Sequence, residues 1–136
     1  MCLRVFSDFR GIDMSKSLMI LVAGPYRSGT NDDPNKMREN LRRLEEAGLT
    51  LFRAGHIPMI GEWVALPLLE VEGSKAVGDK LYDEIVYPAA NRLLSHCDAV
   101  LRLAGDSKGA DEDVRLAKAQ GLPVYDHLDQ IPRAVS

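Results

Sequence analysis

Four short apolar runs alternate along the chain with segments of helical periodicity, and this alternation constrains the fold more than any other feature. The runs cover residues 18–23, 56–60, 98–104 and 122–125. A short apolar run bounded by turn residues is typical of a buried parallel strand, although Pro58 favours a sheet edge for the second run. Strands that alternate with helices predict a parallel sheet with right-handed crossovers. We therefore expect an α/β fold, a single Rossmann-like domain with a parallel four- or five-stranded sheet flanked by helices.

The segments between these runs carry the spacing and end signals of helices. Over residues 34–54, apolar side chains recur every three or four positions, and Asp33 suits the N-cap. Further helices are expected over 79–95, where Pro88 should kink the helix or start a second segment, and over 110–120. Residues 62–78 mix apolar side chains with glycine and serine and predict no clear element.

Composition narrows the classes of function. The chain has 136 residues, of which 46% are hydrophobic and 27% charged, and this fits one folded domain. We expect residues 1–17 to form a flexible N-terminal extension and residues 18–136 to form the domain. The net charge of −3 favours neither a nucleic acid polymer nor an anionic membrane as a partner. The longest apolar run, over 18–23, is too short to cross a membrane.

The cysteines and histidines show no metal-binding pattern. The only two cysteines, Cys2 and Cys97, form no CxxC pair, and no Cys/His cluster has the spacing of zinc ligands. We therefore expect no metal and no cofactor. Sparse cysteine usage also favours a reducing, cytoplasmic compartment.

The loop after the first predicted strand reads Ala23-Gly-Pro-Tyr-Arg-Ser-Gly-Thr30. Gly24 and Gly29 have the spacing of a phosphate-binding loop, but Thr30 stands where such a loop carries its lysine, which argues against a Walker-type NTPase. The backbone N–H groups, together with the forked donor of Arg27, suit an anion. The alternative is an ordinary strand-to-helix turn with a solvated arginine.

A second polar segment, residues 106–113, follows the third predicted strand and reads Asp-Ser-Lys-Gly-Ala-Asp-Glu-Asp. Ligands of parallel sheets bind beyond the carboxyl ends of the strands, where both loops lie. The positive end of a helix dipole favours ionised carboxylates, and such a carboxylate suits a nucleophile or a partner for an oxocarbenium ion. The alternative is that these acidic residues only stabilise the first helical turn.

Several motifs, in their order and spacing, resemble those of the nucleoside 2-deoxyribosyltransferase superfamily, which includes small nucleotide N-glycosidases. Together they cover most of residues 18–125. They are Ala23-Gly-Pro-Tyr26, Arg53-Ala-Gly-His56, Cys97-Asp98-Ala-Val100, Ser107-x-Gly-Ala-x-x-Asp113-x-x-x-Ala117 and Gly121-Leu-Pro-Val124.

The resemblance implies cleavage of the N-glycosidic bond between a base and a ribose or deoxyribose. In the family, a glutamate at the position of Asp113 attacks the anomeric carbon and forms a glycosyl–enzyme intermediate, and the sugar then passes to water or to another base. Asp113 is therefore the expected catalytic residue. The residues expected to bind substrate are Gly24, Tyr26, Arg27, Ser107, Gly109 and Asn91.

The sequence departs from the family pattern at the catalytic position and at a second one. Asp113 is one methylene shorter than glutamate, and the neighbouring Glu112 points about 100° away around a helix. Ala89 and Ala90 stand where the family has an aspartate that assists the leaving base. Asn91, beside them, can hydrogen-bond a base but cannot act as a general acid. Asp83 and Glu84 lie about two turns earlier and could replace that aspartate only if Pro88 kinks the helix toward the site.

Six residues before the catalytic position, the family's transferases on free nucleosides have an aspartate that binds the 5′-hydroxyl, whereas its nucleotide glycosidases have a serine that binds a 5′-phosphate. This chain has Ser107. An aspartate would repel a phosphate, whereas a hydroxyl donates a hydrogen bond to it. We therefore expect a nucleoside or, preferably, its 5′-monophosphate as the small-molecule substrate.

Two alternatives remain open. The chain could be a nucleotide-binding or sensing module of the same fold with little or no catalysis, which the missing carboxylate features favour. Family members also commonly form dimers or larger assemblies in which a neighbouring chain completes the site. The resemblance therefore implies a homodimer or larger homo-oligomer. Trp63 and residues 66–69 could close over a ligand or serve as a subunit contact.

Overall fold

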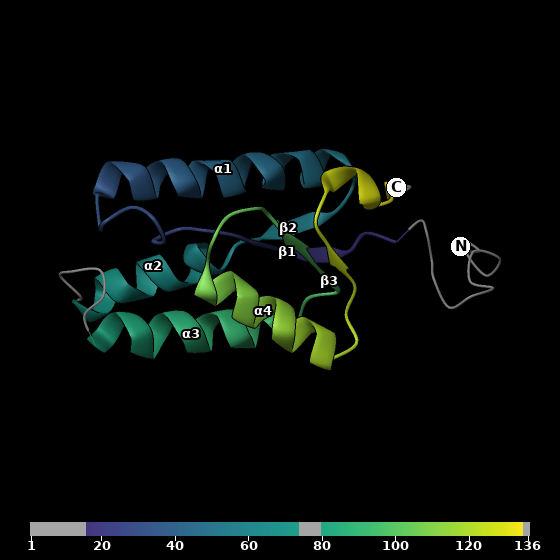
Figure 1. Ribbon diagram of the computed structural model, residues 1–136. Coiled ribbons are helices and arrows are strands. Elements are labelled where there is room, and N and C mark those ends of the chain that lie inside the picture. The colour runs from purple at the N-terminus through teal and green to yellow at the C-terminus, as the bar shows by residue number, and fades with distance from the viewer. Residues whose placement is uncertain (1–15, 74–79, 135–136) are drawn as a thin grey trace.

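The computed structural model describes residues 16–73 and 80–134. Its core is a parallel four-stranded sheet flanked by four helices, which confirms the expected Rossmann-like α/β fold (Figure 1). The strands, in their order across the sheet, are β2 (Ile57–Met59), β1 (Met19–Ala23), β3 (Ala99–Arg102) and β4 (Val124–Tyr125). Residues 1–15 of the expected extension and the whole segment 74–78 lie outside the described residues.

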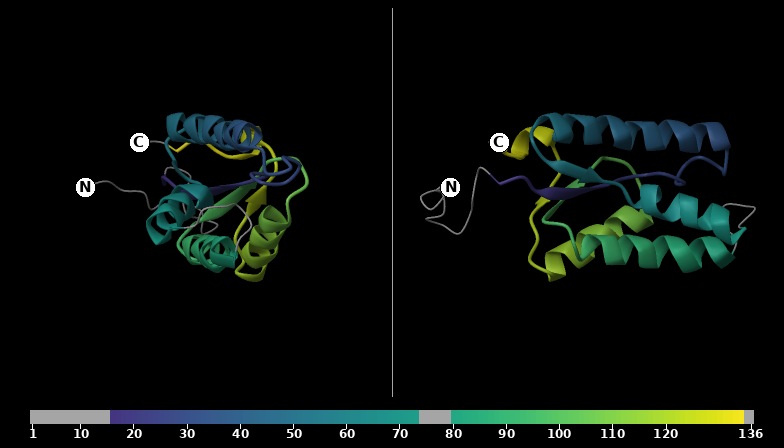
Figure 2. Two further views of the ribbon diagram at one scale, coloured as in Figure 1. Left: turned by 90° about the vertical axis from the view of Figure 1, so that its left-hand side faces the viewer. Right: turned by 180° about the vertical axis from the view of Figure 1, so that it is seen from behind.

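Helices cover both faces of the sheet (Figures 1 and 2). Helix α1 (Pro34–Arg53) and the short helix η2 (Leu128–Gln130) cover one face, where Leu44 and Leu51 pack on strand residues. Helices α3 (Lys80–Leu94) and α4 (Lys108–Ala119) cover the other face, and α2 (Gly61–Glu72) packs beside α3. None of the described helices is both long and apolar enough to cross a membrane.

The strand order places two polar loops next to each other. β1 pairs with β2 on one side and with β3 on the other, and Ala23 is paired with Arg102 at the end of both strands. The chain therefore leaves β1 and β3 at neighbouring points and continues toward opposite faces of the sheet. Such a switch point opens a crevice beyond the strand ends.

Helix α1 follows its sequence signals closely. Asp33 is the N-cap, and its carboxylate accepts a hydrogen bond from the Asn35 backbone N–H at 2.9 Å. Gly48 does not break the helix. A Cβ at that position would lie 3.4 Å from the Pro58 ring, so a glycine lets α1 pack closely on the edge strand β2.

Other helices differ from expectation. Residues 61–72, where no clear element was predicted, form α2, although Pro67 lies inside it. Helix α3 runs without interruption through Pro88, so the expected second segment is not present. Helix α4 begins two residues earlier than predicted because Ser107 caps it.

Two polar side chains near the strands have structural roles. The buried ring of His56 accepts from the Leu18 N–H through Nδ1 at 3.1 Å, so its protonated Nε2 donates to the Pro132 carbonyl at 2.7 Å. Asp98 accepts from the Met19 N–H at 2.9 Å. Both side chains therefore stabilise the amino end of β1, which lies away from the carboxyl ends of the strands where a ligand would bind.

Candidate functional site

A cavity of about 650 Å³ opens at the carboxyl ends of β1 and β3. This volume lies in the range of small-molecule sites. The two polar loops that the sequence singled out therefore face one cavity. All the candidate residues line it: Gly24, Tyr26, Arg27, Asn91, Ser107, Gly109 and Asp113.

The loop after β1 is held by its own polar groups. The buried Thr30 hydroxyl donates to the Arg27 carbonyl and accepts from the Asp32 N–H. From α1, Asn40 donates to the Tyr26 carbonyl at 2.9 Å. Thr30, which stands where a Walker loop has its lysine, therefore orders the loop.

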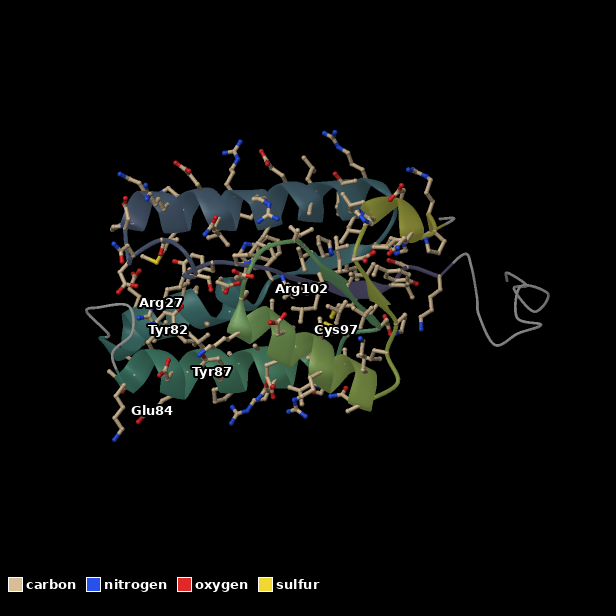
Figure 3. The ribbon with its side chains drawn as sticks, in the orientation of Figure 1. Arg27, Tyr82, Glu84, Tyr87, Cys97 and Arg102 are labelled. Carbon is tan, nitrogen blue, oxygen red and sulfur yellow. The ribbon has the colours of Figure 1, made fainter. Side chains whose placement is uncertain are left out.

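Arg27 forms part of the cavity wall with an aromatic ring. Its Nε donates to an Asp32 carboxylate oxygen at 2.9 Å, and its guanidinium lies 5.6 Å from the centre of the Tyr82 ring (Figure 3). This places the charge of Arg27 over a ring contributed by α3. Sequence reasoning found Arg27 but missed Asp32 and Tyr82, because neither belongs to a recognisable motif.

Gly24 has a packing role that the sequence interpretation did not include. A Cβ there would lie 2.9 Å from Leu44 Cδ2 and 3.2 Å from Leu103 Cβ. The absence of a side chain therefore lets the loop pass between α1 and the end of β3. Gly109 differs, because a Cβ there would meet nothing within 4 Å.

Ser107 begins α4 beside the cavity. Its Oγ accepts a hydrogen bond from the Ala110 N–H at 3.1 Å, which makes it the N-cap. A hydroxyl that accepts in this way still has its proton to donate. The first N–H groups of a helix also lack acceptors within the helix, so this end of the cavity offers donors to an anion.

Arg102 orders the loop that precedes α4, and sequence reasoning missed it. Arg102 is the last residue of β3, and its Nη2 donates to the Gly105 carbonyl at 3.0 Å and to Asp111 Oδ1 at 2.8 Å. Figure 3 shows its place at the centre of the molecule. The contacts tie the strand to the first turn of α4, which carries Asp113 one turn further along.

The carboxyl group of Asp113 has a strongly perturbed acidity. Burial, followed by the nearby charges of Glu62 and Glu112, raises its pKa from 3.8 to about 7, against an opposing effect of Arg102. The sequence led us to expect a carboxylate that the helix dipole keeps ionised, and this expectation is wrong. Desolvation at the cavity wall outweighs the dipole.

The neighbouring acidic residue, Glu112, also lines the cavity but is held by an arginine. Arg115 Nε donates to Glu112 Oε1 at 2.9 Å, and this hydrogen bond lowers the pKa of Glu112. Glu112 is therefore already engaged and is the poorer candidate for the group that attacks a substrate.

Glu62 is the carboxylate that sequence reasoning missed. It is the second residue of α2, lines the cavity and is half-buried. Burial raises its pKa, while a hydrogen bond with its own backbone N–H lowers it. Glu62 also raises the pKa of Tyr26, Tyr82 and Asp113, so its charge lies near groups from three other segments.

The expected substitutes on α3 do not reach the cavity. Asp83 and Glu84 are exposed, and Glu84 lines a separate groove between α2 and α3 (Figure 3). Because α3 continues through Pro88, no second segment turns these carboxylates inward. Asn91 lines the cavity from the same helix.

Comparisons with known proteins add no family assignment. No model of a known protein family matches the chain, and no curated protein sequence matches it. Within residues 16–73 and 80–134, no group of three or more His, Cys, Asp or Glu side chains is arranged to hold a metal ion.

Proposed function

We propose that this protein cleaves the N-glycosidic bond of a nucleoside or, preferably, its 5′-monophosphate. The observation that carries the proposal is the single cavity in which Asp113 lies with the donor-rich first turn of α4 and the loop after β1. A carboxyl group whose pKa is about 7, in a cleft, is typical of functional sites. The resemblance to nucleoside 2-deoxyribosyltransferases supports the same chemistry.

In the proposed reaction, the ionised Asp113 attacks C1′ of the sugar and the base leaves. Water or a second base then takes the sugar from the aspartyl ester, as in retaining glycosidases. Ser107 precedes Asp113 by six residues, which is about 9 Å along a helix. A 5′-phosphate at the first turn of α4 and C1′ near Asp113 can therefore be bound by one helix.

Release of free base tests the proposal. Nucleosides and nucleoside 5′-monophosphates, in ribose and deoxyribose forms, are incubated with the protein and the bases are separated by chromatography. We expect base release that Asp113→Ala abolishes. The matched control is Asp129→Ala, the same substitution at an exposed residue of η2 that does not line the cavity, which should retain base release. Release that survives Asp113→Ala would refute the assignment of the nucleophile.

The alternative is a nucleotide-binding module that has lost turnover. It is favoured by the shorter side chain at position 113 and by Ala89 and Ala90 where the family has an acid. In that case no base is released, and nucleotides still raise the melting temperature. Thermal shifts measured with the same compounds distinguish the two functions.

The substrate class is tested at Ser107. Ser107→Asp retains an N-cap for α4 but places a negative charge beside a bound phosphate. It should weaken binding of 5′-monophosphates much more than binding of nucleosides. Equal effects on both classes would refute the phosphate assignment.

The groove between α2 and α3 supports the proposed homodimer. Its volume is about 590 Å³, and it is lined largely by apolar side chains, with Leu68 and Val71 50% and 87% exposed. Acidic side chains lie toward one end of the groove and basic ones toward the other: Glu72, Glu84, Arg92 and His96. A second copy packed antiparallel across a two-fold axis would match these charges. Val71→Glu should then convert dimers to monomers in sedimentation experiments, and a wild-type monomer would refute the dimer.

A further inference from the structure

Six acidic residues line the cavity, and three of them already pair with an arginine. Asp32 pairs with Arg27, Asp111 with Arg102 and Glu112 with Arg115. All three carboxylates are therefore already engaged by a guanidinium, and the hydrogen bond from Arg115 lowers the pKa of Glu112. The side chains of Asp106, Glu62 and Asp113 remain, and Asp106 is exposed on the loop after β3.

Glu62 and Asp113 approach the cavity from different helices. Glu62 begins α2, directly after β2, whereas Asp113 lies in the second turn of α4. No ion pair among the described residues includes Glu62. The charge of Glu62 raises the pKa of Asp113, so the ionisation of one carboxyl group disfavours the ionisation of the other.

The orientation of Glu62 is set by its neighbour in the sequence. Trp63 donates from its indole Nε1 to Glu45 Oε2 on α1 at 2.8 Å. Consecutive side chains on a helix point about 100° apart. With Trp63 fastened to α1, Glu62 is directed to the cavity side of α2.

We propose that Glu62 is the acid–base partner of Asp113. This inference rests on the proposed glycosidic cleavage. In the first step, an Asp113 oxygen bonds to C1′, the C1′–N bond breaks, and the departing nitrogen takes its electron pair and the proton of Glu62. In the second step, water attacks C1′ and gives a proton to Glu62, while the ester bond breaks and Asp113 regains its charge. Both side chains end as they began, and the net reaction is hydrolysis.

This role supplies the function that the resemblance expects from an aspartate near position 90. There the chain has Ala89 and Ala90, and the acids Asp83 and Glu84 on the same helix are outside the cavity. The proton donor therefore comes from α2 instead of α3. The other charged and titratable groups near the pair come from several segments. They are Tyr26 after β1, Tyr82 on α3 with Arg27 beside it, Cys97 before β3, Glu112 and Arg102 beside Asp113, and Arg38 of α1 near Tyr26.

The test compares two leaving groups in Glu62→Gln. A nucleobase needs a proton as it leaves, whereas 4-nitrophenolate leaves as a stable anion. Glu62→Gln should slow base release from nucleoside monophosphates by about 10²- to 10⁴-fold. It should slow hydrolysis of 4-nitrophenyl deoxyriboside 5-phosphate less than 10-fold. The matched control is Glu70→Gln, the same chemical change on the exposed side of α2, which should leave both rates unchanged.

The two proposals fail in different ways. If the wild-type protein cleaves neither substrate, the proposed function fails. If it cleaves both and Glu62→Gln retains base release, or loses both activities equally, the role of Glu62 as a proton donor is refuted. The wild-type protein provides a second test. Its pH profile should be bell-shaped for nucleotides and should lack the alkaline limb for the nitrophenyl substrate, whereas identical profiles would overturn the proposal.

Discussion

The raised pKa of Asp113 predicts a pH dependence of stability that can be tested whether or not the protein is an enzyme. This pKa is about 7 in the folded protein against an ordinary value of 3.8. Between these two values the folded state binds a proton that the unfolded state releases, so Asp113 costs stability as the pH rises from 4 to 7. The full shift corresponds to about 4 kcal/mol at most, of which more than half falls between pH 5 and pH 8.

Asp113→Asn removes this cost because an amide does not ionise. Solvent screening of a partly exposed group reduces the effect, so we expect the substitution to stabilise the protein by about 1 to 2 kcal/mol more at pH 8 than at pH 5. Urea unfolding, followed by circular dichroism at both pH values, measures the difference.

The control for this experiment is Asp111→Asn on the same helix. Asp111 is exposed and pairs with Arg102, so its loss should cost less than about 1 kcal/mol, by nearly the same amount at both pH values. If Asp113→Asn changes stability equally at pH 5 and pH 8, the carboxyl group is not desolvated. The argument for a functional site would then lose its electrostatic support.

Three further predictions concern packing and reactivity. Gly24→Ala should destabilise the fold by about 1 to 3 kcal/mol because of the short contacts described above, whereas Gly109→Ala, which meets no atom within 4 Å, should not; urea unfolding of both variants compares them. His56→Leu should cost about 2 to 4 kcal/mol by removing hydrogen bonds to two partly buried backbone groups, and an unchanged unfolding midpoint would contradict the structural role. Burial raises the pKa of the Cys97 thiol to about 11, so in a Cys2→Ser variant this thiol should react with a disulfide reagent only after unfolding; rapid labelling of the native protein would show otherwise.

The elements that the sequence predicted best are those with local signals. Asp33 and Pro34 mark the start of α1 by capping and ring geometry, and both act only on their own helix turn. The strands β1 and β3 are apolar on both faces because helices cover both sides. In these segments the local sequence pattern and the tertiary environment favour the same structure, so the pattern alone predicts the element correctly.

Helix α2 could not be predicted in this way. Some of its apolar side chains contact α3, and others line the groove between α2 and α3. They therefore form no single apolar stripe along the helix. Pro67 also lies inside it, where a proline normally argues against a helix. Helix α2 is therefore stabilised by its packing on α3, and the local sequence pattern carries no information about that contact.

The candidate site was predictable in part for a topological reason. The loops after β1 and β3 were expected to meet because parallel strands end at one edge, and they do. The same rule, applied to the second strand, would have singled out Glu62, which follows β2 by three residues. The raised pKa of Asp113 could not be predicted from residue spacing. It depends on burial by side chains from several segments of the chain.

The charge of the cavity decides whether a phosphate is a reasonable ligand. With a pKa of about 7, Asp113 carries at most one negative charge near neutral pH. At about 9 Å, the repulsion for each charge on the phosphate is about 0.5 to 2 kcal/mol, depending on the effective dielectric constant. Each hydrogen bond from Ser107 or a first-turn N–H of α4 to a charged oxygen contributes about 1.5 to 3 kcal/mol. Two such bonds offset the repulsion, so a 5′-monophosphate fits this cavity despite its acidic residues.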